Sequence, residues 1–193
     1  MIQRLVGSEM CIRDRAAHRV STDVAYPWDQ GSKALSADEL KRREAWQSRF
    51  MPSGAIVAGR VDRLHWMTFG TPETLPLLYS EQPPLMTKGR QQAVVRVGAL
   101  QSDSEATEAQ TLNWSTAPRG TAVSVRMSGL LWPEAAARIA NSAYVTRERV
   151  GKGQVILFSG QPNFRGSTRG VGRVWLNALV YGPGLGTSAR VEL

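Results

Sequence analysis

Hydrophobic residues in the first half of the chain follow two different spacings. Between Ser36 and Pro52 they recur at roughly helical intervals, and Ser36 followed three residues later by Glu39 is typical of a helix start. We therefore predict a helix that ends before Pro52. Short apolar runs then predict strands, separated by turn residues, at 55–61, 75–79 and 93–97.

The second half begins with an alternating stretch, in which Val123, Val125 and Met127 predict a half-buried strand. Pro133 suits the first position of a short helix that ends near Asn141. Further strands are predicted at 143–150 and 154–160, with a tight glycine turn between them. A final helix is expected, with Arg173 and Asn177 on one side. Its other side is expected to be buried and consists of Val171, Val174, Trp175, Ala178 and Leu179.

The run 155–158 is apolar at every position, which is typical of a strand covered on both faces. We place this strand at the centre of the sheet. Strands that alternate with helices predict an α/β fold, in which a layered, mostly parallel or mixed sheet has flanking helices. The tight turn before residue 154 favours the mixed arrangement, because so short a connection joins antiparallel strands.

The charge of the chain changes this picture little. Its 193 residues include 24 Lys+Arg and 16 Asp+Glu, a formal net charge of +8. A nucleic-acid interface would gather these cations on one surface, but arginines such as Arg60, Arg96 and Arg126 are scattered along the sequence. The charge indicates an ordinary solvated surface, and nucleic acid is not expected as a partner. No apolar run approaches the roughly 18 residues of a membrane-spanning helix, so no membrane span is expected either.

Catalytic chemistry is limited by the scarcity of its usual residues. Cys11 is the only cysteine, and His18 and His65 are the only histidines. Neither histidine has a second ligand at the short spacing of a zinc site. His65, beside Trp66 in an apolar segment, is interpreted as a hydrogen-bonded, partly buried residue. The glycine-rich stretch 166–172 fits neither common phosphate-binding motif. We assign no catalytic residue, metal ligand or cofactor to this chain.

One loop has a possible binding role. Ligands of α/β proteins commonly bind beyond the carboxyl ends of strands, and the 161–170 loop follows a predicted strand and precedes a helix N-terminus, which favours anions. Its candidate ligand-binding residues are Asn163, Arg165 and Arg169. The alternative is that Asn163 and Arg165 hold the loop in shape by bonding to backbone carbonyls.

The first fifteen residues, MIQRLVGSEMCIRDR, resemble the translation of a sequencing adapter joined to an assembled read. We interpret residues 1–15 as such an artefact, which would remove Cys11 from the native protein and place the native start upstream. Residues 16–35 are polar and aperiodic, and we interpret them as a linker or the remnant of a lost upstream element.

Several longer motifs occur in order along the rest of the chain. They are His65-Trp66-Met67-Thr68-Phe69-Gly70, SGLLWPEA at 128–135, GKGQVILF at 151–158 with PNFR at 162–165, Asn177-Ala178, and GPG at 182–184. This series resembles the C-terminal, class I glutamine amidotransferase-like region of large multidomain bacterial zinc carboxypeptidase-like proteins. The resemblance covers 36–187, with a flexible insertion at 101–119, and leaves 188–193 as a tail.

The resemblance implies an incomplete amidotransferase-like domain of flavodoxin-like fold, without its first strands. The parent would be a secreted or periplasmic zinc metallocarboxypeptidase, a hydrolase that activates water with zinc to cleave the C-terminal bond of a peptide substrate. Its zinc ligands would lie in an upstream peptidase domain, the expected partner of this region. The amidotransferase-like domain of such proteins lacks the cysteine nucleophile, so a non-catalytic accessory domain is implied.

Two other functions stay open at this point. A free-standing α/β domain would bind an anionic small molecule at the 161–170 loop, and a basic nucleic-acid-associated protein is the weaker alternative. The upstream reading frame distinguishes them, since a His-x-x-Glu motif there would indicate the peptidase parent.

Overall fold

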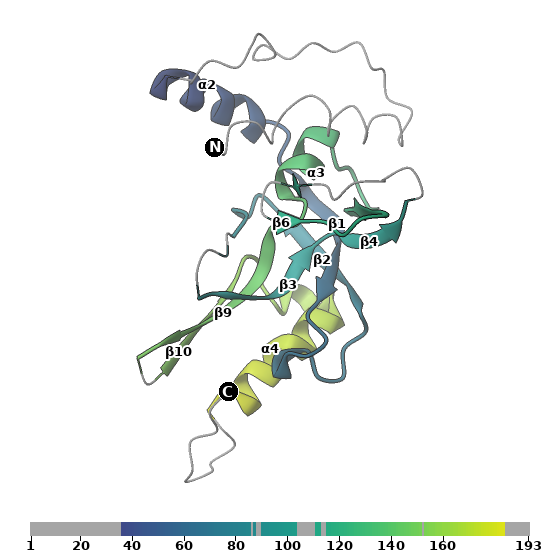
Figure 1. The fold of residues 1–193 in the computed structure, drawn as a ribbon, viewed down its shortest axis with the longest axis vertical. Coiled ribbons are helices and arrows are strands. Elements are labelled where there is room, and N and C mark those ends of the chain that lie inside the picture. Colours follow the sequence, from purple (N-terminus) through teal and green to yellow (C-terminus); the bar gives the residue numbers. More distant parts are fainter. Residues whose placement is uncertain are drawn as a thin grey trace.

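The computed structural model describes residues 36–85, 87, 90–103, 111–112, 115–151 and 153–183. Its main feature is one curled sheet with the strand order β10-β9-β3-β1-β2, and β8 pairs with β1 outside this path (Figure 1). The strands are β1 (Ser53–Val61), β2 (Thr74–Ser80), β3 (Gln92–Val97), β8 (Arg126–Ser128), β9 (Ala143–Val150) and β10 (Gly153–Phe158). The strands predicted at 55–61, 75–79, 93–97 and 143–150 are confirmed.

Every pairing between these described strands is antiparallel. A short connection explains the pairing of β9 with β10, because only residues 151–152 join them, whereas parallel neighbours need a crossover of about a dozen residues or more. The α/β class predicted from the sequence is confirmed. The predicted strand arrangement, mostly parallel or mixed, is wrong for the described strands, because all of their pairings in the sheet are antiparallel.

Two small ribbons accompany the main sheet. β4 (Ala99–Ser102) pairs with β7 (Thr121–Ser124), and β5 (Thr111–Leu112) pairs with β6 (Ser115–Thr116). Gly98, with a φ of 98°, separates β3 from β4 and lets the chain leave the main sheet. The single strand predicted through Val125 is therefore two strands, since β7 pairs with β4 and β8 pairs with β1. Parts of the 101–119 stretch, predicted as a flexible insertion, form the end of β4 and the strands β5 and β6.

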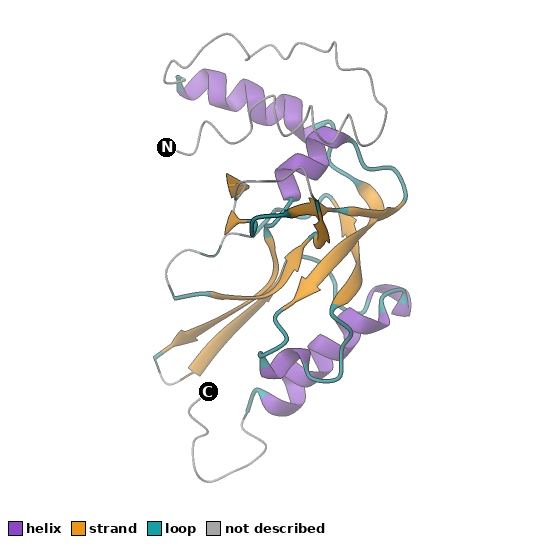
Figure 2. Ribbon diagram, turned by 45° about the vertical axis from the view of Figure 1, so that its right-hand side comes forward, coloured by secondary structure: helices purple, strands orange, loops and turns teal. Residues whose placement is uncertain are grey.

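The predicted helices are present with small differences in their ends. They are α2 (Ala37–Ser48), α3 (Pro133–Ile139) and α4 (Arg169–Tyr181), and short 3-10 turns form η1 (Trp66–Thr68) and η2 (Phe164–Gly166). Pro133 occupies the first turn of α3, where its missing N–H costs nothing. Figure 2 shows α4 beside the lower part of the sheet, and α2 and α3 at the opposite end. The two ends of the sheet thus have different helical neighbours.

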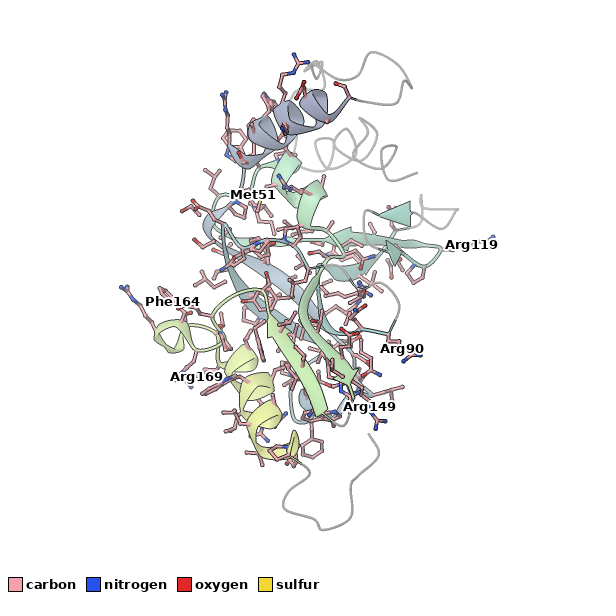
Figure 3. All side chains as sticks on the ribbon, turned by 90° about the vertical axis from the view of Figure 1, so that its left-hand side faces the viewer. Met51, Arg90, Arg119, Arg149, Phe164 and Arg169 are labelled. Atoms are coloured by element: carbon pink, nitrogen blue, oxygen red, sulfur yellow. The ribbon has the colours of Figure 1, made fainter. Side chains whose placement is uncertain are left out.

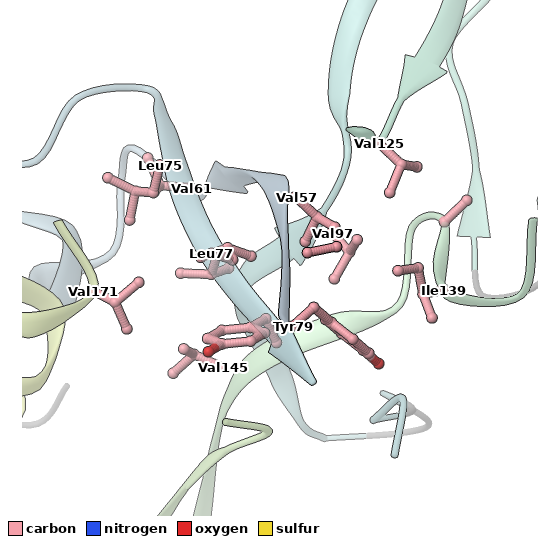
Figure 4. Close-up of a cluster of buried hydrophobic side chains, with 14 of the residues drawn as sticks. Val57, Val61, Leu75, Leu77, Tyr79, Val97, Val125, Ile139, Val145 and Val171 are labelled. Atoms are coloured by element: carbon pink, nitrogen blue, oxygen red, sulfur yellow. The ribbon is translucent and has the colours of Figure 1, made fainter. Parts of the chain in front are cut away.

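The core combines buried strand residues with residues of α4 and of α3, such as Val174 and Ile139. Strand register places Val57 opposite Leu77 on the same face, and both side chains are fully buried. Val171 of α4 packs on this cluster (Figure 4). Burying an aliphatic side chain of this size contributes about 1.5–3 kcal/mol. Further members of the cluster are Leu75, Tyr79, Val94, Val95, Val97, Val145 and Val174.

The central position predicted for the strand 154–160 is wrong. β10 lies at the edge of the sheet and pairs with β9 alone among the described strands. Ile156 packs against the core, whereas Val155 and Leu157 on the other face are 44% and 51% exposed. Side chains of a strand alternate between faces, so a run that is apolar throughout leaves half of its side chains uncovered when only one face meets the core.

Several sequence-based predictions lie outside the described residues. These are the adapter-like stretch 1–15, the linker 16–35, the tail 188–193, Cys11 and His18. Over the part of the chain that is described, the helices are too short or too polar to cross a bilayer.

Candidate functional site

The loop predicted to bind an anion connects β10 to α4. It contains η2, whose preceding residue Asn163 has a φ of −127° and whose central residue Arg165 has a φ of 50°. Arg169 is the first residue of α4. Figure 3 shows Phe164 and Arg169 on the same side of the molecule, away from Arg90 and Arg149. The structure therefore places Asn163 and Arg165 in the loop and Arg169 at the start of the helix that follows it.

All three candidate side chains are exposed. The Arg165 guanidinium lies over the ring of Phe164, with 5.3 Å from Cζ to the ring centroid. Asn163 makes no side-chain capping bond to η2. Exposed cations are strongly screened by water and salt, and such an arrangement would hold an anion only weakly. The assignment of Asn163, Arg165 and Arg169 as ligand-binding residues stays a prediction.

Two of the motifs that carry the family resemblance meet in space. Asn177 in α4 is 2% exposed, and its side-chain amide donates hydrogen bonds of 2.8 Å to the backbone carbonyls of Met67 and Phe69. The motif at 65–70 and the Asn177-Ala178 motif are thus joined across more than a hundred residues. These bonds satisfy carbonyls of a tight turn that would otherwise lack a donor when buried.

A second side-chain amide, that of Gln154, bonds a distant backbone carbonyl just beyond the C-terminal end of α4. Gln154 of β10 donates from Nε2 to the carbonyl of Gly182 at 3.0 Å. The Oε1 atom of Gln154 accepts from Nε of Arg147, and Nη1 of Arg147 donates to Oε1 of Gln92. Burial lowers the pKa of Arg147, and nearby Arg149 lowers it further. Gln154 of β10 is therefore bonded to Gly182, just beyond the end of α4.

His65 has the structural role that the sequence predicts. It is buried, and its Nδ1 accepts a 3.2 Å hydrogen bond from the N–H of Met67 at the start of η1. Burial lowers its pKa, with a smaller contribution from Arg147, while Asp62 and Gln92 act in the opposite direction. The imidazole is thus held neutral as a helix cap.

The described residues do not fit a zinc site. Among them no group of three or more His, Cys, Asp or Glu side chains is close enough to hold a metal ion. A zinc site needs at least three such ligands. No catalytic step through zinc can be derived from these residues.

The outward side of α4 is a feature that the sequence analysis missed. Trp175 and Leu179, predicted to be buried, are 37% and 53% exposed, whereas Asn177, predicted to lie on another side of the helix, is buried. Exposed apolar residues three or four positions apart form one stripe along α4, on the side opposite Val171 and Val174. This α4 stripe consists of Trp175, Leu176, Leu179 and Val180. A helix that is apolar on both sides is typical of one covered on both sides.

No protein-family model, curated protein or solved structure matches this chain.

Proposed function

We propose that this chain is the non-catalytic C-terminal accessory domain of a zinc metallocarboxypeptidase-like exopeptidase, and that it acts by packing against the peptidase domain. The motifs between 65 and 184, in their order along the sequence, support this parentage. The exposed α4 stripe is the single observation that carries the packing role.

The positions of the motifs support an architectural role. Asn177 and Gln154 use their amides to join distant parts of the backbone, and His65 caps a turn. These side chains are committed to protein acceptors and donors. Residues used in this way stabilise a domain, and they are poorly placed to act on a substrate.

The α4 stripe supports a neighbouring domain as the partner. Leu176 and Leu179 place exposed leucine side chains on one helix face, and the exposed residues Arg169 and Arg173 flank them. The surface that would cover this face is apolar with an acidic rim. Exposed apolar clusters of this kind are typical of interaction surfaces.

The zinc, the peptide substrate and the secreted or periplasmic location belong to the proposed parent. Zinc would activate water in the peptidase domain, and this chain would contribute no ligand to it. The finer fold assignment, an incomplete amidotransferase-like domain of flavodoxin-like type, is part of the same proposal. It requires parallel strands that would be supplied outside the described residues.

The first experiment is to sequence the genomic region upstream of the codon for Ala16. We expect an open reading frame that continues in frame and encodes a His-x-x-Glu motif followed by a later histidine. A stop codon directly upstream, or a frame without peptidase motifs, would refute the parentage.

A further inference from the structure

Two arginines face each other on neighbouring central strands. Arg60 of β1 is the direct register partner of Arg96 of β3, although 35 residues separate them in the sequence. Side chains of directly paired residues project from the same face of an antiparallel pair, and like charges in such positions repel. Both side chains are partly buried, so water screens this repulsion incompletely.

Both guanidinium groups converge on one residue. Nη2 of Arg60 donates to Oδ1 of Asn141 at 2.8 Å, and Nη1 of Arg96 donates to the backbone carbonyl of Asn141 at 3.0 Å. Nη2 of Arg96 also donates to the hydroxyl of Thr87 at 3.1 Å. All of these acceptors are neutral. Within the described residues, the two arginines have no hydrogen bond or ion pair to a carboxylate.

Asn141 holds this arrangement rigidly. It is completely buried, and its N–H donates to the carbonyl of Val97 at 2.8 Å. Its φ of 63° lies in the left-handed region, which asparagine tolerates better than most residues. The turn between α3 and β9 is thereby fixed against β3, and it fixes the positions of both guanidinium groups.

One nitrogen of the pair has no acceptor. Nη1 of Arg60 is buried from water and makes no hydrogen bond within the described residues. A buried donor without an acceptor is costly, and more so when it carries charge. Burial and the neighbouring Arg96 lower the pKa of Arg60, and burial lowers the pKa of Arg96. An anion at this position would remove both the repulsion and the unmet hydrogen bond.

We propose that Arg60 and Arg96, held by Asn141, form a binding site for a small oxyanion, either a phosphate or a carboxylate. Guanidinium groups bind such anions with paired hydrogen bonds, which a neutral ligand cannot match. The site differs from the 161–170 loop, whose arginines are exposed. It does not depend on the parentage proposed above.

The test measures the melting temperature of the full chain in inorganic phosphate, in acetate and in sodium chloride at matched ionic strength. At about ten times its Kd, a ligand specific for the folded state should raise the melting temperature by about 4 °C. An increase in phosphate alone that saturates with concentration indicates a phosphate site, and a saturating increase in acetate alone indicates a carboxylate site. Saturation is required because exclusion of phosphate from protein surfaces also raises the melting temperature, but without a binding curve. No increase in either anion over chloride would overturn the proposal.

Variants locate the effect. Arg60→Gln and Arg96→Gln should each abolish the increase, and Arg119→Gln, which changes an exposed arginine outside both candidate sites, should retain it. An equal increase in Arg60→Gln would overturn the proposal. If Arg60→Gln does not fold, the Nε–H resonances of the wild-type arginines provide the same test, because only Arg60 and Arg96 should shift strongly with the bound anion. A shift of the Arg165 and Arg169 resonances instead would place binding at the loop and refute the site.

Discussion

The side-chain amide of Asn177 donates a 2.8 Å hydrogen bond to the backbone carbonyl of Met67, which lies 110 residues earlier in the chain. The same amide nitrogen bonds Phe69, so one buried side chain of α4 fastens the η1 turn to the helix. The β1–β2 connection and the C-terminal helix are thereby held as one unit. Asn177 therefore acts as a structural clamp in this fold.

Asn177→Ala should destabilise the protein by about 2–3 kcal/mol, because two turn carbonyls lose their donor in a buried setting. Urea unfolding measures this loss. Asn163→Ala provides the matched control, since Asn163 is exposed and makes no capping bond, and its effect should stay within about 0.5 kcal/mol. Equal effects of the two substitutions would show that the clamp contributes nothing.

Two leucines on the sheet should respond very differently to truncation. Leu77→Ala in β2 should cost about 2–5 kcal/mol, because the fully buried side chain leaves a cavity in the core. Leu157→Ala at the edge strand should cost less than about 1 kcal/mol, since half of that side chain is already exposed. Both values come from urea titration. A larger loss for Leu157→Ala would mean that the outer face of β10 is covered in the folded chain.

The stability of the fold should depend on pH through His65. Burial holds its folded pKa below the unfolded value of about 6.5, so the unfolded chain binds more protons between these two values. The stability that depends on a neutral His65 is fully present above pH 6.5 and is lost as the pH falls through 6.5 toward the folded pKa. Urea unfolding between pH 7.5 and pH 5 measures it.

The matched variant is His65→Asn, which keeps a side-chain acceptor at this cap position but does not titrate. Its unfolding free energy should change less steeply over that pH interval than that of the wild type. The difference in slope for one proton is at most about 1.4 kcal/mol per pH unit. Parallel curves would assign the pH dependence to other groups.

The positions of helices and strands could be predicted well because apolar spacing reports them directly. The sequence could not predict which side of a helix or strand is buried when both sides are apolar. The apolar residues of α4 would allow either side of the helix to face the sheet. Asn177 selects the side that is buried, because its amide bonds distant backbone carbonyls. The same ambiguity explains β10, where Val155 and Ile156 look equally suited to a core.

The arginine pair could not be predicted for a different reason. Arg60 and Arg96 are unremarkable in sequence, and the register between β1 and β3 alone makes them neighbours. The candidate residues Asn163, Arg165 and Arg169 could be grouped from the sequence because they share one loop. Contacts that depend on strand pairing need the structure.

The central claim is that this chain packs against a preceding peptidase domain through the α4 stripe. The direct measurement is the calorimetric affinity between the full chain and the separately purified domain encoded upstream in the same reading frame. Saturable binding is predicted for the wild type, a loss of at least tenfold in affinity for Leu176→Ser/Leu179→Ser, and no change for Leu157→Ser, whose leucine is equally exposed but lies on β10. No binding by the wild type, or equal binding by the Leu176→Ser/Leu179→Ser variant, would contradict the account.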